Sequence, residues 1–108
     1  MKIIRIAVLT CFAASASAWA EDDIPALWKA KCESCHGADG KAQTKQGKKH
    51  KVDDMTNEKW QANWTDDKIK KIIREGSKDK KEMKAFPADK VSDSELDGLV
   101  KHIRSFKG

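Results

Sequence analysis

The chain has 108 residues, of which 36% are charged and 39% are hydrophobic, and its length predicts one small domain. The formal net charge is +5, and it falls to +3 without Lys2 and Arg5. So modest a positive charge is a poor fit for nucleic-acid binding.

Residues 1–20 have the pattern of a cleaved secretory signal peptide. Lys2 and Arg5 give a positive start, an apolar run follows, and residues 18–20 (Ala-Trp-Ala) form a small-x-small cleavage site. The apolar run is too short for a transmembrane helix. We therefore expect export to the periplasm, a mature domain over residues 21–108, and no stable membrane insertion after cleavage.

Cleavage after Ala20 would also decide which thiols remain. Cys11 would leave with the signal peptide, so that Cys32 and Cys35 are the only cysteines of the mature domain. The alternative is a lipid anchor on Cys11, which is disfavoured because Thr10 is a poor residue before a lipidated cysteine. The mature domain then has no spare disulfide framework, although exported proteins meet an oxidising compartment.

The first predicted helix runs from Ile24 to Cys35. Asp23 can cap its start, Pro25 suits its first turn, and Gly37 follows as a stop signal.

This helix leads into Cys32-Glu33-Ser34-Cys35-His36, the C-x-x-C-H pattern of a covalent attachment site for a c-type haem. Residues three apart share one helix face, so both thiols can reach the vinyl groups of one porphyrin, and His36 can offer its imidazole to the iron. The pattern predicts one haem c bound through two thioethers. The alternatives are a zinc site, which lacks a second cysteine pair, and a redox disulfide, which lacks a strand-containing scaffold.

Residues 38–57 are polar, contain five lysines and are predicted as an extended loop with short helical turns. A loop of this length usually has a function, and wrapping a cofactor would be one.

A second helix is predicted from Thr65, a good N-cap residue, to Glu75, with Gly76 as its stop. Its apolar face consists of Ile69, Ile72 and Ile73.

The last predicted helix follows a capping box, in which Ser92 precedes Glu95 by three residues. Apolar residues then recur at helical spacing up to Phe106. The sequence therefore predicts an all-α fold with three main helices joined by long loops.

These motifs, in this order, resemble class I cytochrome c over the whole mature chain. The small monohaem bacterial type, similar to cytochromes c6 and c553, is the nearest in pattern, and residues 32–36 are the most specific part. The resemblance implies a small cytochrome c fold around one haem and a diffusible electron carrier rather than an enzyme. The alternatives are a haem-based gas sensor or peroxidase-like protein with a labile sixth ligand, and the cytochrome subunit of a dehydrogenase.

The resemblance also implies a methionine as second axial ligand, in the loop before the last helix. Met83 has this position, although Lys84 follows it where the family often has proline. Core packing is the alternative role for Met83, and it is the role we expect for Met55. The resemblance further implies that the indole of Trp64 donates to a haem propionate, with simple core packing as the alternative.

The other two histidines are expected not to ligate iron. His50 is predicted to face solvent, and His102 to pack against Trp28 on the first helix. With no proline near His36 to supply the acceptor for its Nδ1–H, a backbone carbonyl of the 40s loop is the expected substitute.

Lysines cluster at residues 41–51, 68–71 and 78–84. If the first and last of these loops flank the haem, a positive rim would steer a monomeric carrier to redox partners with acidic docking surfaces. The alternative is an ordinary solvated lysine surface.

Overall fold

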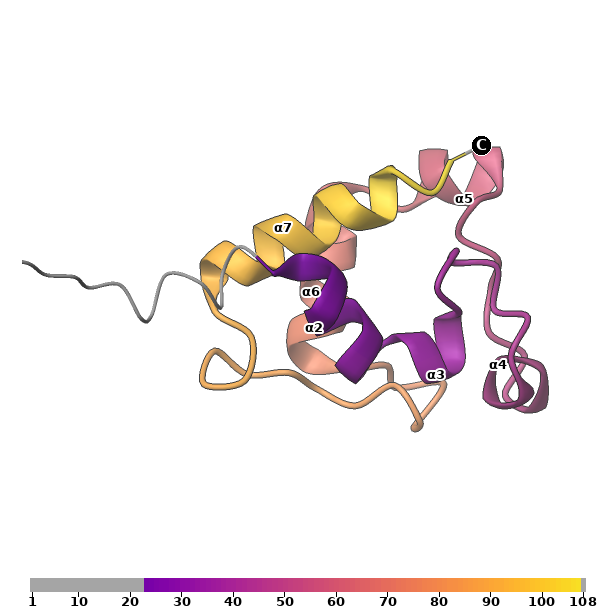
Figure 1. The fold of residues 1–108 in the computed structure, drawn as a ribbon, viewed down its shortest axis with the longest axis horizontal. Coiled ribbons are helices and arrows are strands. Elements are labelled where there is room, and N and C mark those ends of the chain that lie inside the picture. The colour runs from indigo at the N-terminus through magenta and orange to yellow at the C-terminus, as the bar shows by residue number, and fades with distance from the viewer. Residues whose placement is uncertain (1–22, 108) are drawn as a thin grey trace, which may run out of the picture.

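The computed structural model describes residues 23–107, which form six helices and contain no strand (Figure 1). This confirms the predicted all-α fold; the predicted signal peptide lies outside the described residues. No helix within residues 23–107 has the length and apolar character needed to cross a membrane. In chain order, the helices are α2 (Ile24–Lys31), α3 (Glu33–His36), α4 (Lys45–Lys49), α5 (Glu58–Asn63), α6 (Asp66–Glu75) and α7 (Asp93–Arg104).

The first predicted helix is interrupted at Cys32, so that it forms α2 and α3 rather than one continuous helix. Asp23 caps α2 as expected, accepting from the amide of Ala26 at 3.3 Å. The indole N–H of Trp28 on α2 donates to the carbonyl of Gly37 at 2.9 Å, which ties the end of α3 back to α2. This long-range bond accounts for the bend, because a straight helix would carry Gly37 away from Trp28.

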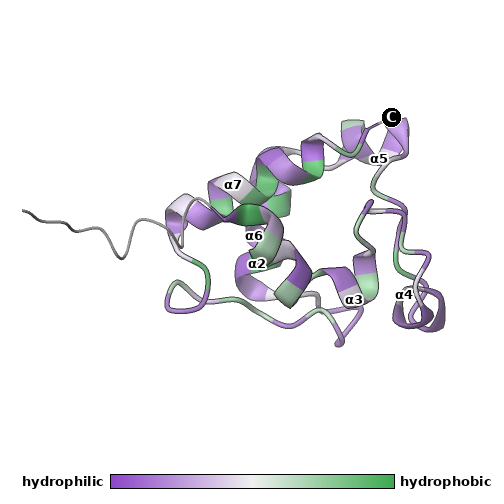
Figure 2. Cartoon of the chain, viewed as in Figure 1, coloured by the Kyte–Doolittle hydropathy of each residue, from purple (hydrophilic) through white to green (hydrophobic). Residues whose placement is uncertain are grey.

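The predicted loop over residues 38–57 contains the short helix α4, which is capped by Thr44. The helix α5, with Asn57 as its N-cap, was not predicted. Both helices are short and largely polar, as the hydropathy colouring in Figure 2 shows for α4. Helices of this length are marginal on their own and depend on tertiary contacts.

Helices α6 and α7 form where the sequence predicts them. Thr65 caps α6 and Gly76 ends it with a φ of +80°, while both hydrogen bonds of the Ser92–Glu95 capping box are present in α7. Their apolar residues form the core together with Trp28 of α2, and Figure 2 shows green stretches of ribbon where the three helices lie. The least exposed core side chains are Ile69, Val91, Leu99 and Ile103.

Helices α2 and α7 pack closely where Gly98 lies against Ile24. A Cβ atom on Gly98 would stand 2.6 Å from Cδ1 of Ile24, so a larger residue would require the Ile24 side chain to move. His102 packs against Trp28 with ring centroids 5.2 Å apart, which confirms its predicted role. Burial lowers the pKa of His102, so the neutral imidazole is favoured at this contact.

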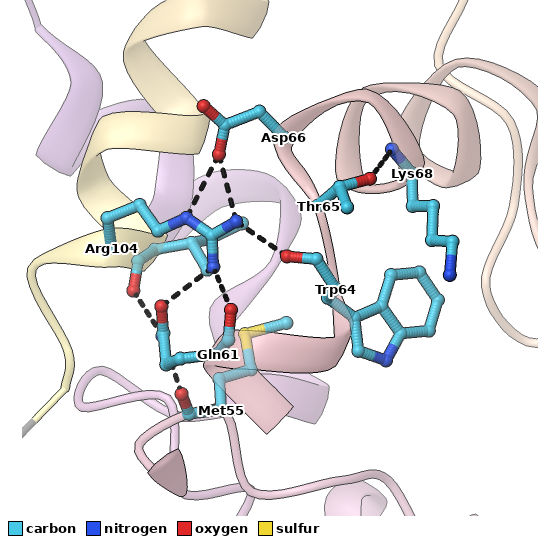
Figure 3. Close-up of polar contacts among 8 residues, drawn as sticks. Met55, Gln61, Trp64, Thr65, Asp66, Lys68 and Arg104 are labelled. Atoms are coloured by element: carbon cyan, nitrogen blue, oxygen red, sulfur yellow. Dashed lines mark hydrogen bonds and ion pairs between the residues drawn. The ribbon is translucent and has the colours of Figure 1, made fainter. Parts of the chain in front are cut away.

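The side chain of Arg104 fastens the end of α7 to the segment that joins α5 and α6 (Figure 3). Its guanidinium donates to the carbonyl and side-chain oxygens of Gln61, both at 2.9 Å, to the carbonyl of Trp64 at 2.5 Å, and to Asp66. Gln61 in turn donates to the carbonyl of Met55 at 2.7 Å. One arginine thus fixes the backbone on which Met55 and Trp64 are carried.

Arg74 of α6 holds the other side of the molecule in the same way. It donates to the carbonyls of Phe86 at 2.9 Å and Val91 at 2.5 Å, and to Asp93 at 2.7 Å. The loop that carries Met83 is therefore anchored at its far end to α6 and to the start of α7.

Candidate haem-binding site

A cavity of about 600 Å³ lies between α2, α3, α6 and the loop that follows α6. Its volume falls within the roughly 300–1,000 Å³ range of ligand pockets in proteins. The lining is mainly apolar and includes side chains of the core, among them Ile69, Ile73, Leu99 and Ile103.

The cavity brings together the five site residues that the sequence predicts. Cys32, Cys35 and His36 line it, and so do Met83 and Trp64. Their shared location shows that the motif and the methionine loop, about 50 residues apart in sequence, open onto one space. Which atoms bond to a cofactor remains a prediction.

Both cysteines are free thiols, and neither is fully exposed. Burial raises the pKa of Cys32 to about 12, with nearby Lys31 acting in the opposite direction, so that the thiol is protonated at neutral pH. Among the described residues, no group of three or more His, Cys, Asp or Glu side chains is arranged to hold a metal ion. The cysteine pair therefore lacks the companions that a zinc site requires.

The surroundings of His36 favour its neutral form. Burial lowers its pKa, while Asp53 acts in the opposite direction, and metal coordination requires the deprotonated ring nitrogen. Its Nδ1 atom is buried without a hydrogen-bond partner among residues 23–107. His36 itself lines the cavity, and which of its ring nitrogens would meet a cofactor remains a prediction. The predicted 40s-loop acceptor for Nδ1 is wrong, because that loop bonds to the backbone of the motif instead.

The 40s loop contacts the motif through Thr44 and Gly47. The hydroxyl of Thr44 donates to the carbonyl of Ser34 at 2.7 Å. A Cβ atom on Gly47 would lie 2.5 Å from the carbonyl oxygen of Cys35 and 2.4 Å from that of Ala42, distances that real Cβ atoms do not show. Only glycine fits here, so Gly47 is what lets α4 pack directly on α3. The sequence analysis did not predict this role, because in the sequence Gly47 is one glycine in a polar loop and its contact with α3 cannot be seen.

The two methionines differ in their surroundings. Met55 is 9% exposed and belongs to the core cluster, which confirms its predicted packing role, although it also reaches the cavity. Met83 is half-buried in the loop after α6, where its carbonyl accepts from the amide of Ser77 at 3.0 Å. Gly76 permits this arrangement, because a Cβ atom there would lie 2.8 Å from the same carbonyl oxygen.

Trp60 and Trp64 stack on each other with ring centroids 5.6 Å apart, and both line the cavity. In the part of the chain that the structure describes, the indole N–H of Trp64 has no hydrogen-bond partner, whereas that of Trp28 is bonded to Gly37. A donor with no protein acceptor beside the cavity is consistent with the predicted bond to a propionate, which remains a prediction.

His50 differs from its prediction. It is half-buried at the cavity wall rather than facing solvent, and 22% of its side chain is exposed. Nε2 pairs with Gln46 at 3.1 Å, and Nδ1 lies 3.4 Å from a carboxylate oxygen of Glu82. Both ring nitrogens of His50 thus have partners, whereas Nδ1 of His36 has none among residues 23–107.

The cavity therefore fits a haem in its residues as well as its volume. Two thiols and an imidazole whose neutral form is favoured line it, together with apolar side chains. Thiols that could form thioethers, an imidazole that could ligate iron, and apolar walls that would exclude water are the groups that such a cofactor needs.

Comparison with known proteins agrees with this chemistry. Residues 20–103 match the family model described as cytochrome c oxidase, cbb3-type, subunit III. A solved structure described as the KustC0563 c-type cytochrome is 31% identical and superposes with a TM-score of 0.70. The match covers 80% of this chain and 99% of that one. The comparison with curated proteins gave no match.

Proposed function

This chain belongs to the c-type cytochrome family, and from that membership we propose that it is a soluble periplasmic carrier of single electrons. Family membership implies haem-based electron transfer and a covalently attached haem c. The finer proposal is that Cys32 and Cys35 form the two thioethers and that His36 and Met83 are the axial ligands. The observation that carries it is that all four side chains line one cavity.

When bound, the haem supplies a one-electron couple at its iron. The chain's own residues then hold and tune it. The thioethers would prevent loss of the cofactor, and the neutral imidazole of His36 and the soft sulfur of Met83 would fill both axial positions. Methionine with histidine raises the potential, as in other cytochromes c. With no position open to a substrate, the site would carry electrons rather than transform a molecule.

The visible and near-infrared spectra of the purified holoprotein test this proposal. A methionine–ferric band in the near infrared, and a reduced protein that does not bind carbon monoxide, are the expected results. Rapid carbon monoxide binding by the reduced protein would contradict it and favour a gas sensor or a peroxidase-like protein with a labile sixth ligand.

A role as the electron-transfer subunit of a larger complex is the second candidate, since the matching family model is named for an oxidase subunit. The solved relative is described only as a c-type cytochrome and does not distinguish the two candidates. Co-purification from the native periplasm and membranes under gentle conditions would distinguish the two. A free monomer is expected, and stable association with a membrane oxidase or a dehydrogenase would favour the subunit role.

We further propose that the partner's docking surface is acidic. The exposed lysines that line the cavity are Lys31, Lys84 and Lys90, whereas the lysines of the 40s loop do not line it. Exposed carboxylates of Asp53, Asp79 and Glu82 line the cavity as well, so the rim differs from the one predicted and has no excess of exposed lysines. The proposal therefore rests on the net charge of +3 of residues 21–108 together with these three lysines. A charged rim speeds encounter with an oppositely charged partner and loses this effect in salt.

Electron transfer to the native redox partner is therefore expected to slow as ionic strength rises. At low salt, Lys90→Gln should reduce the bimolecular rate roughly twofold or more, because it removes one steering charge. Lys45→Gln, which removes an exposed lysine away from the cavity, should have a smaller effect. Stopped-flow kinetics measures both. A rate that is flat from low to high salt would show that these lysines are only a solvated surface.

A further inference from the structure

Lys80 differs in its burial from the other lysines around Met83. Lys78, Lys81 and Lys84 are exposed, whereas Lys80 is half-buried and lines the cavity. Holding a long charged side chain in one half-buried position costs conformational entropy and hydration, so specific contacts must offset that cost.

Those contacts cross from one loop to another. Nζ of Lys80 donates to the carbonyl of His50 at 3.1 Å and also to the carbonyl of Lys51. These carbonyls lie at the C-terminal end of α4, where backbone oxygens have no partner within the helix. Lys51 itself has a φ of +55°, a left-handed conformation, as the chain turns there. An ammonium group at this point satisfies two acceptors with charge-assisted bonds, which are stronger than neutral ones.

The backbone of Lys80 is joined to the proposed ligand. Its carbonyl accepts from the amide of Met83 at 2.9 Å, and its amide donates to the hydroxyl of Ser77 at 3.0 Å. The residue therefore connects the turn that carries Met83 to the segment that follows α4. In Figure 1 the loop after α6 runs toward α3 and α4 before it returns to α7.

Few other contacts hold this side of the loop. Arg74 anchors the far end at Phe86, and Gly76 and Ser77 anchor the near end on α6. Between them, Glu82 pairs with His50 at 3.4 Å, but 43% of the Glu82 side chain is exposed, and exposed pairs contribute little. Lys80 is thus the principal tie between the middle of the loop and the opposite wall of the cavity.

We propose that Lys80 is a positioning residue that holds the Met83 loop closed over the cavity by bridging it to the carbonyls of His50 and Lys51. This proposal rests on the proposed ligation of the iron by Met83. It adds that the contacts of Lys80 determine how readily the Met83 sulfur leaves the iron. Opening the loop requires Lys80 to release both carbonyls, so that methionine dissociation is coupled to the break between the two loops.

Titration of the ferric holoprotein with imidazole, which competes with methionine for iron, tests the proposal. The near-infrared methionine band reports the fraction still ligated. In Lys80→Ala the apparent imidazole affinity should rise at least about tenfold, which corresponds to about 1.4 kcal/mol. Lys81→Ala is the matched control, since it removes the same charge from an exposed neighbour, and its affinity should stay within about twofold of the parent.

Two further variants show whether the bridge itself is responsible. Lys80→Arg keeps a charged donor that can reach two carbonyls and should restore the parent affinity to within about threefold. Lys80→Gln keeps a neutral amide donor, so its apparent imidazole affinity should lie between those of the parent and of Lys80→Ala. This variant also tests the bridge if the alanine variant does not fold.

The outcomes separate this proposal from the one on which it rests. Equal imidazole affinities in Lys80→Ala and Lys81→Ala, with the methionine band present in both, would overturn the bridge and leave Met83 as ligand. Absence of the band from the parent protein would overturn the ligation, and the proposed role of Lys80 with it.

Discussion

Replacing Met83 with alanine is expected to abolish the near-infrared methionine–ferric band completely and to open the haem iron to external ligands. Without the sulfur, no other described side chain of this loop can take its place as a soft neutral ligand. The reduced variant should then bind carbon monoxide stoichiometrically, and its potential should fall, because methionine ligation raises it. Optical spectroscopy and a potentiometric titration measure these changes.

Met55→Leu is the matched control for this experiment. Met55 reaches the same cavity, but it belongs to the core and its backbone is held by Gly40 and Gln61. Leucine has a similar volume, so the substitution should retain the band at a cost below about 1.5 kcal/mol in stability. If the band survived in Met83→Ala and vanished in Met55→Leu, the ligand would have to be reassigned to Met55.

The second large effect is expected for Arg104→Leu, which should lower the free energy of unfolding by about 2–4 kcal/mol. The carbonyls of Gln61 and Trp64 would lose a charged donor that is 29% exposed. The ion pair with Asp66 contributes little to this figure, because 63% of that carboxylate side chain is exposed. Guanidinium unfolding of the oxidised holoprotein measures the change.

Two variants serve as controls for Arg104. Lys101→Leu removes an exposed positive charge from the same helix and should change stability by less than about 0.5 kcal/mol. Arg104→Lys keeps the charge but not the planar fork, so it should lose part of the stability. An Arg104→Leu variant as stable as Lys101→Leu would show that this network does not hold α7 to the α5–α6 segment.

The accuracy of the sequence predictions depended on how local the determining interactions are. The capping box at Ser92 and Glu95, and the cap and stop at Thr65 and Gly76, act within one turn and can be read directly. Helix α5 could not be predicted in this way. It is short, and the guanidinium that fixes its Gln61 carbonyl comes from 43 residues further along the chain.

The same difference between local and long-range interactions applies to the candidate site. The cysteines and His36 are recognisable because their spacing is local, whereas Met83 is indicated only by the family resemblance and its place before the last helix. The bend at Cys32 was missed because a bond between Trp28 and Gly37 determines it. The half-burial of His50 was missed too, since it depends on Glu82, 32 residues away, and on the loop that carries it.

The contact between Gly98 and Ile24 joins parts of the chain that are 74 residues apart, and it has a consequence for the order of folding. Helix α2 packs on α3 close by in sequence, but its contact with α7 requires a long stretch of chain to be closed into a loop, so we expect this pairing to form late in folding. The core side chains Leu99 and Ile103 of the cavity wall also belong to α7. Until that helix arrives the wall is incomplete, and Cys32 and Cys35 stay accessible. The cavity beside Cys32 and Cys35 is therefore complete only when the two ends of the described chain have packed together.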